Sequence, residues 1–174
     1  MTLDRSLRGA LAGGIAAAVW AAQQPLDKRV FECDYDDAEL LGKMVTRGPF
    51  AYPVGVAMHV VNGALFGAVY ANVAPSVPGP PALRGAAAGL AEHLATWPGA
   101  LVIDRLDLGR DFPKLWGDPR AFGQATWRHL LFGAILGELE HQLNPPEADP
   151  EPVDAASVAS NGHGSAEHLV ATGP

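Results

Sequence analysis

The chain has 174 residues and a formal net charge of −7, with 48% hydrophobic and 18% charged residues. Its single cysteine, Cys33, excludes a disulfide within the chain and a cysteine-based zinc site. The acidic balance and the lack of a basic stripe exclude nucleic acid as an expected partner. The charged fraction is below the roughly 25% of average soluble proteins. What remains between the charged stretches is four blocks rich in Ala, Gly, Leu and Val.

These four blocks predict four helices, over residues 7–22, 52–74, 83–103 and 122–143. A helix that spans a membrane needs ~20 mostly apolar residues, so the last three are long enough and the first is short. Prolines between 75 and 81 predict a tight connection from the second helix to the third. The sequence therefore predicts an all-α domain over residues 1–143, formed by a bundle of four transmembrane helices.

Two polar segments accompany the predicted helices. The loop over residues 24–51 is long for a connection between neighbouring helices, and long loops are usually functional or disordered. Within it, Asp34–Glu39 predicts the start of a short surface helix that continues to Met44. Residues 144–174 are rich in Glu, Asp, Pro, Ser and Gly, which predicts a disordered acidic tail.

The first block also fits a signal peptide, since Arg5 and Arg8 precede an apolar run. An internal repeat favours a structural helix instead. The segment from Leu7 to Gly13 recurs from Leu83 to Gly89 with six of seven residues identical, and the spacing of His59, Gly63 and Gly67 recurs in residues 129–137. The chain is therefore expected to consist of two similar helical hairpins, related by an axis along the membrane normal.

A soluble four-helix bundle is the competing interpretation of these blocks. A surface helix of a soluble bundle shows a charged stripe opposite its apolar one. The second block has no charged residue between Tyr52 and Ala74, which favours the membrane and makes the lipid bilayer the expected partner. The distribution of Lys and Arg favours a cytoplasmic position for both larger loops, whereas Arg5 and Arg8 before the first helix favour the opposite orientation. A homo-oligomer or a membrane partner is left open.

Glycines at four-residue spacing predict the faces on which the helices pack. Residues four apart share a helix face, and small residues there let membrane helices approach closely. The predicted packing residues are Gly9, Gly13, Gly63, Gly67, Gly85, Gly89, Gly133 and Gly137.

Polar residues fall on the same predicted inward faces. We expect a buried polar pocket formed by His59, Asn62, Glu92, His93, Arg128 and His129. Glu92 and His93 lie near the middle of the third predicted helix, where an ionised carboxylate costs at least ~2.5–3.5 kcal/mol. Arg128 is the cation at the nearest depth, so we predict that Glu92 pairs with Arg128. Unperturbed histidine titrates near ~6.5, so such a pocket would respond to mild acid.

Three functions are compatible with this pattern. The first is a non-enzymatic membrane protein whose pocket handles protons or a small solute. The second is a structural or partner-binding membrane subunit in which the polar cluster only fixes helix packing. The third is a membrane metal or haem binder, for which Glu138 and His141 have the spacing of di-iron bundles, although a second such pair is missing. We expect no bound cofactor and no metal, and nucleotide-binding motifs are absent from the sequence.

The chain resembles the YagU-like family of small bacterial inner-membrane proteins over roughly residues 5–143. The resemblance rests on Gly9-x-x-x-Gly13 with Trp20 and Pro25, and on the segments 59–70, 89–98 and the residues from His129 onward. It implies a multi-pass protein of the bacterial plasma (inner) membrane with the three histidines as recurring positions, and it brings no established reaction. The first loop is shorter than expected of that family and carries the lone cysteine, which puts any carried-over role of the loop in doubt.

Overall fold

The computed structural model describes residues 3–46, 48–108 and 112–145, and over these the chain is helical with no strand. The all-α class predicted from the sequence is thereby confirmed. The elements in chain order are α1 (Leu3–Phe31), α2 (Asp37–Val45), α3 (Ala51–Val73), the 3₁₀ turn η1 (Ala74–Ser76), α4 (Pro81–Thr96), α5 (Gly99–Arg105) and α6 (Pro119–Leu143). Except for residues 144 and 145, the acidic tail lies outside the described residues.

Two helices differ from their predicted bounds. The first is much longer than 7–22, because α1 runs through Pro25 to Phe31. The third, expected as one helix over 83–103, is interrupted at Pro98, which has no N–H to continue the ladder of helical hydrogen bonds. As a correction to the expected mid-helix position, Glu92 and His93 therefore lie near the C-terminal end of α4.

The short helix expected in the first loop is present as α2, and its start is explained by capping. Asp36 is the N-cap, and its carboxylate accepts a hydrogen bond from the backbone N–H of Glu39 at 2.9 Å. The helix is only partly superficial, because it packs on α3. A Cβ added at Gly42 would collide with the backbone at Ala51, and one added at Gly55 would collide with the backbone at Ala38.

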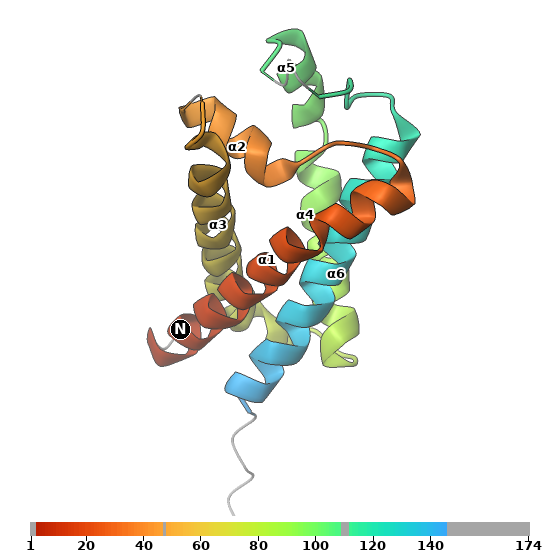
Figure 1. Ribbon diagram of the computed structural model, residues 1–174. Coiled ribbons are helices and arrows are strands. Elements are labelled where there is room, and N and C mark those ends of the chain that lie inside the picture. Colours follow the sequence, from red (N-terminus) through yellow and green to blue (C-terminus); the bar gives the residue numbers. More distant parts are fainter. Residues whose placement is uncertain (1–2, 47, 109–111, 146–174) are drawn as a thin grey trace, which may run out of the picture.

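The long helices form two antiparallel pairs, α1 with α3 and α4 with α6, and α1 also packs against α6 (Figure 1). Both pairs are joined through glycines that leave no room for a side chain. In the first pair Gly13 faces the Gly63 carbonyl. In the second pair Gly89 is the equivalent of Gly13, and it faces the His129 carbonyl. The equivalent of Gly63 in this pair is Gly133, which lies one helical turn from His129. The two hairpins thus pack in the same way but in registers that differ by one turn.

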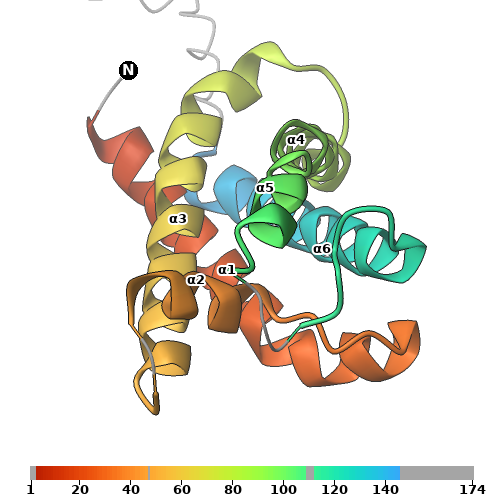
Figure 2. The same cartoon turned by 90° about the horizontal axis from the view of Figure 1, so that it is seen from above.

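The spatial order α3, α1, α6, α4 leaves the two outer helices, α3 and α4, apart from one another (Figure 2). The short helices α2 and α5 lie at one end of these outer helices, and the chain from η1 to α4 connects them at the other end (Figures 1 and 2). One apolar cluster in the middle of the bundle includes Ala16, Trp20, Phe132 and Leu136. A second lies at the α2–α5 end and includes Leu115.

Candidate functional site: a polar pocket between α3 and α4

A cavity of about 630 Å³ lies between α3 and α4, on the side of α2 and α5. Its walls come from α1 to α6, and it contains five of the six residues predicted for the pocket: His59, Asn62, Glu92, His93 and His129. The sixth, Arg128, is not part of the lining. Because the third predicted helix is broken, this group lies toward one end of the bundle, beneath α2 and α5.

The three histidines are linked by ring contacts through a tryptophan. The Trp20 ring lies edge-on to His59 and to His129, with centroid distances of 4.7 and 4.6 Å. The His129 ring is in turn 4.7 Å from that of His93. Trp20 thus separates His59 from the other two histidines, although it was not among the residues predicted for the pocket.

Glu92 and His129 hold one proton between them. His129 Nδ1 lies 2.7 Å from the carbonyl oxygen of Ala125, which can only accept, so Nδ1 carries a hydrogen. His129 Nε2 lies 2.8 Å from Glu92 Oε2, and this contact also requires a hydrogen. The pair is therefore either an imidazolium with a carboxylate or a neutral imidazole with a carboxylic acid. In both cases it has one proton more than a neutral histidine beside an ionised glutamate.

His93 is completely buried, and among the described residues one of its ring nitrogens has no partner. The Thr126 hydroxyl donates to the carbonyl of Phe122 at 2.8 Å, so its oxygen accepts from His93 Nε2 at 3.0 Å. In neutral His93 the other nitrogen, Nδ1, then has a free lone pair. Two more buried nitrogens of the lining, His59 Nε2 and Trp20 Nε1, also lack a partner. Such groups are costly unless a ligand or water satisfies them.

The predicted pair of Glu92 with Arg128 is wrong. The Arg128 side chain is fully buried and donates twice to Asp27, with both distances 2.6 Å. It donates once more to Asp37 at 2.7 Å and once to the backbone carbonyl of Tyr35 at 3.0 Å. The reason is geometric: neighbouring residues of a helix point roughly 100° apart, so residue 129 of α6 faces Glu92 while residue 128 faces α1.

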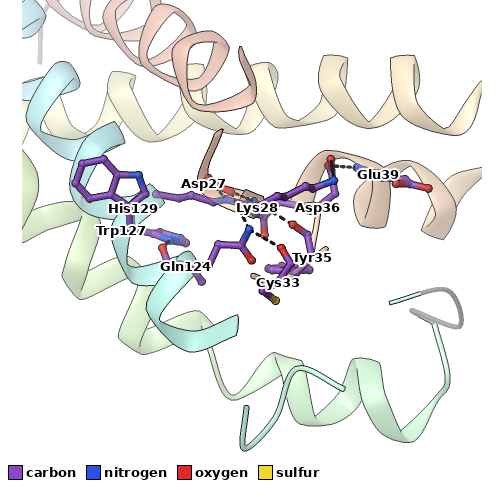
Figure 3. Close-up of polar contacts among 12 residues, drawn as sticks. Asp27, Lys28, Cys33, Tyr35, Asp36, Glu39, Gln124, Trp127 and His129 are labelled. Carbon is purple, nitrogen blue, oxygen red and sulfur yellow. Dashed lines mark hydrogen bonds and ion pairs between the residues drawn. The ribbon is translucent and has the colours of Figure 1, made fainter. Parts of the chain in front are cut away.

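The buried ion cluster of Arg128, Asp27 and Asp37 joins α1, α2 and α6. Figure 3 shows Asp27 of this cluster among its neighbours, which include Gln124 and Tyr35. Gln124 adds hydrogen bonds to Asp27 at 2.8 Å and to the Cys33 carbonyl at 3.1 Å. Sequence reasoning missed Asp27 because it placed the end of the first helix at residue 22. An aspartate following an apolar helix, within reach of an arginine in another apolar helix, was the available signal.

Asp37 belongs both to this cluster and to the lining of the pocket. Burial by itself would raise the pKa of Asp37, but the charge of Arg128 and hydrogen bonds from Tyr35 and Arg128 outweigh burial and lower it. Burial and the neighbouring Asp37 carboxylate raise the pKa of the Tyr35 hydroxyl well above its ordinary value. Tyr35 therefore stays protonated and donates to an ionised Asp37 at neutral pH.

No family model, curated protein or solved structure matches this chain. The resemblance to the YagU-like family therefore stays a prediction. Across the part of the chain that the structure describes, no group of three or more His, Cys, Asp or Glu side chains is arranged to hold a metal ion.

Proposed function

We propose that this chain is a non-enzymatic, multi-pass protein of the bacterial inner membrane whose pocket holds and exchanges one proton at the Glu92–His129 pair. The observation that carries the proposal is the geometry of this pair. The Nδ1 hydrogen of His129 is held by the Ala125 carbonyl, so the contact between Nε2 and Glu92 needs a second proton, and the Glu92 side chain is 36% exposed within a cavity that can admit water or a solute.

The outer faces of the bundle support the membrane part of the proposal. On α1, Leu7, Leu11, Ile15 and Val19 form a stripe at four-residue spacing with exposures between 40% and 58%. On α3, Val61, Leu65, Val69 and Val73 form a second stripe with exposures between 53% and 63%. Contiguous apolar surface of this kind marks contact with lipid or with another protein.

One helical segment of the described ranges, Ala51–Ser76, is by itself long and apolar enough to cross a membrane. A core helix of a soluble protein would pass the same test but would be mostly buried, whereas only 33% of the apolar window is buried here. Some charges of the other long helices are paired within the bundle, such as Arg5 with Glu140 at 2.9 Å. This pairing is compatible with a lipid environment, in which unpaired charges are costly.

The membrane assignment is tested by fractionation of cells that express the chain. The protein should stay with the membrane after an alkaline carbonate wash and should need detergent for release. Release by the wash, as a folded and monodisperse protein, would contradict the proposal.

The proton pair is tested by nitrogen NMR of histidine-labelled protein in detergent over about pH 5 to 9, a range around the ordinary histidine pKa. We expect His129 Nε2 to carry a proton, and we expect this proton to be gained or lost within this pH range. Glu92→Gln should leave a neutral His129 at pH 7, because the glutamine amide can donate to Nε2. Glu138→Gln, an exposed change on the same bundle, serves as the matched control. An unprotonated Nε2 at every pH in the wild type, together with an ionised Glu92 in the carboxyl carbon spectrum, would refute the pair.

A structural membrane subunit is the second candidate, and the close glycine contacts favour it. In that case the Glu92–His129 contact would join α4 to α6 and do nothing else. Thermal stability separates the two: a structural contact predicts that Glu92→Gln lowers the melting temperature at all pH values. A proton site predicts that the variant melts like the wild type at high pH and loses only the pH-dependent part.

A further inference from the structure

The cavity has an apolar part that the proton pair does not explain. Leu65, Phe66 and Val69 of α3 line it together with Ile103 of α5. Leu65 and Val69 are also 63% and 62% exposed and belong to the outer stripe of α3. Because the same side chains face the cavity and the exterior, the cavity reaches the apolar surface between α3 and α4. Figure 2 shows these two helices set apart. A ligand could therefore enter from the side of the bundle.

The charge of the lining selects the sign of such a ligand. Among the residues that the structure describes, the ionisable groups of the lining are two carboxylates, Asp37 and Glu92, the three histidines and the phenol of Tyr35, with no Lys or Arg. With Arg128 and Asp27 included, and with one proton on the Glu92–His129 pair, these groups carry a net charge of −1. An anionic head group is thus disfavoured, and a cation is favoured.

Aromatic side chains favour a cation as the ligand. Trp20, Tyr35, Phe66, Trp97 and Phe132 all line the cavity. A ring face that is free attracts a cation with about 0.5–2 kcal/mol, and more strongly where water is excluded. The ring of Tyr35 already has the Arg128 guanidinium 5.5 Å from its centroid, so the other four rings are the ones available to a ligand.

We propose that the pocket binds an amphipathic organic cation, which enters between α3 and α4 and pairs with Glu92 in exchange for the proton that Glu92 shares with His129. This inference rests on the proposed function. On binding, the hydrogen bond between His129 Nε2 and Glu92 breaks and the proton leaves to water. His129 remains neutral with its Nδ1 hydrogen on the Ala125 carbonyl. One positive charge replaces another, so the charge of the pocket is unchanged.

The other charged and titratable groups facing this pair limit the pH range in which the exchange is seen. They come from every neighbouring element: Asp27 of α1, Tyr35 before α2, Asp37 of α2, His59 of α3, His93 of α4 and Arg128 of α6. Among them, His59 and His93 also titrate below neutral pH when exposed. The experiment is therefore carried out slightly above neutral pH, where these two histidines are neutral.

Calorimetry of the detergent-solubilised full chain with tetraphenylphosphonium tests the inference. Tetraphenylborate, which has the same shape and the opposite charge, is the matched control, and titration into empty micelles corrects for detergent. We expect binding of the cation only. In buffers of different ionisation enthalpy it should release about one proton, as the shared hydrogen of the pair requires.

Two variants locate the site. Glu92→Gln should weaken cation binding at least about tenfold, or 1.4 kcal/mol, whereas Glu138→Gln should not change it. Val69→Trp should weaken binding by filling the lateral opening. Since Val69 is exposed, this change leaves the proton pair in place even if Glu92→Gln proves unstable.

Each outcome decides a separate point. Equal or tighter binding of tetraphenylborate, or no binding of either ion, would overturn the inference. Binding of the cation without proton release would overturn the exchange. The nitrogen NMR of His129 is recorded without any added cation, so the proton pair stands or falls independently of these results.

Discussion

Arg128→Gln is the substitution whose cost the structure predicts most directly. The guanidinium makes two hydrogen bonds to Asp27, and the two side chains are 0% and 1% exposed. A hydrogen bond to a charged group contributes about 1.5–3 kcal/mol, so losing two costs about 3–6 kcal/mol. An independent estimate, the cost of leaving one partner of a buried ion pair alone, is about 3–5 kcal/mol. We therefore expect Arg128→Gln to destabilise the fold by about 3–5 kcal/mol.

A double-mutant cycle with Asp27→Asn measures the pair itself. Unfolding of the detergent-solubilised protein is followed for the wild type, the two single variants and the double variant. Because the double variant leaves neither charge unpaired at this contact, it should be little worse than either single one. The coupling free energy is then close to the cost of one single variant, about 3–5 kcal/mol.

The same cycle for Glu92 and Arg128 is the control. These residues share no hydrogen bond in the structure, since Glu92 contacts His129 and Arg128 contacts Asp27. Their coupling should be much smaller than that of Asp27 with Arg128. Strong coupling of Glu92 to Arg128 combined with additivity for Asp27 would refute the ion cluster and restore the pair predicted from the sequence.

Three further predictions concern packing, pH and the cysteine. Gly13→Ala should cost about 1–3 kcal/mol because its Cβ meets the Gly63 backbone, whereas the adjacent Gly14→Ala, with 3.8 Å of clearance, should be neutral or stabilising in thermal unfolding. The pKa of Asp37 is lower in the folded protein than its value of ~3.9 in the unfolded chain, so the ionised carboxylate stabilises the fold above pH ~3.9. This stabilisation is lost as the pH falls through the pKa of the folded state. Asp37→Asn should therefore reduce the dependence of the melting temperature on pH in acid. Cys33 is 5% exposed, and burial raises the pKa of its thiol, so maleimide should label it only after unfolding; rapid labelling of the folded protein would contradict this burial.

The helices and the composition of the pocket were predictable because both follow from local patterns. Apolar blocks and their prolines indicated the long helices, although not the break at Pro98. Four-residue spacing placed His59, His93 and His129 on inward faces, and the structure brings all three to one cavity. These inferences need only the helical period, which the sequence displays directly.

The partner of Arg128 could not be predicted in the same way. It depends on where α1 ends, because Asp27 belongs to that helix only if the helix continues past Pro25. It also depends on the rotation of α6, since a shift of one residue turns a side chain by roughly 100° and exchanges the roles of Arg128 and His129. The pair of Glu92 with Arg128 was predicted from depth along the membrane normal, and depth gives no information about the rotation of a helix.

The internal repeat gives a reason why only one hairpin carries the proton pair. Aligning Leu7 with Leu83 places Ala16 and Ala17 of α1 where α4 has Glu92 and His93. In addition, the first pair packs in a register that differs by one turn, so His59, the equivalent of His129, lies against Trp20 and meets no carboxylate on its own partner helix. Trp20 in turn aligns with Thr96, so the first hairpin places a bulky ring where the second has a small polar side chain that lines the cavity. A bundle of two similar hairpins thus encloses one asymmetric pocket, and the exchange proposed for it involves one proton and one cation for each chain.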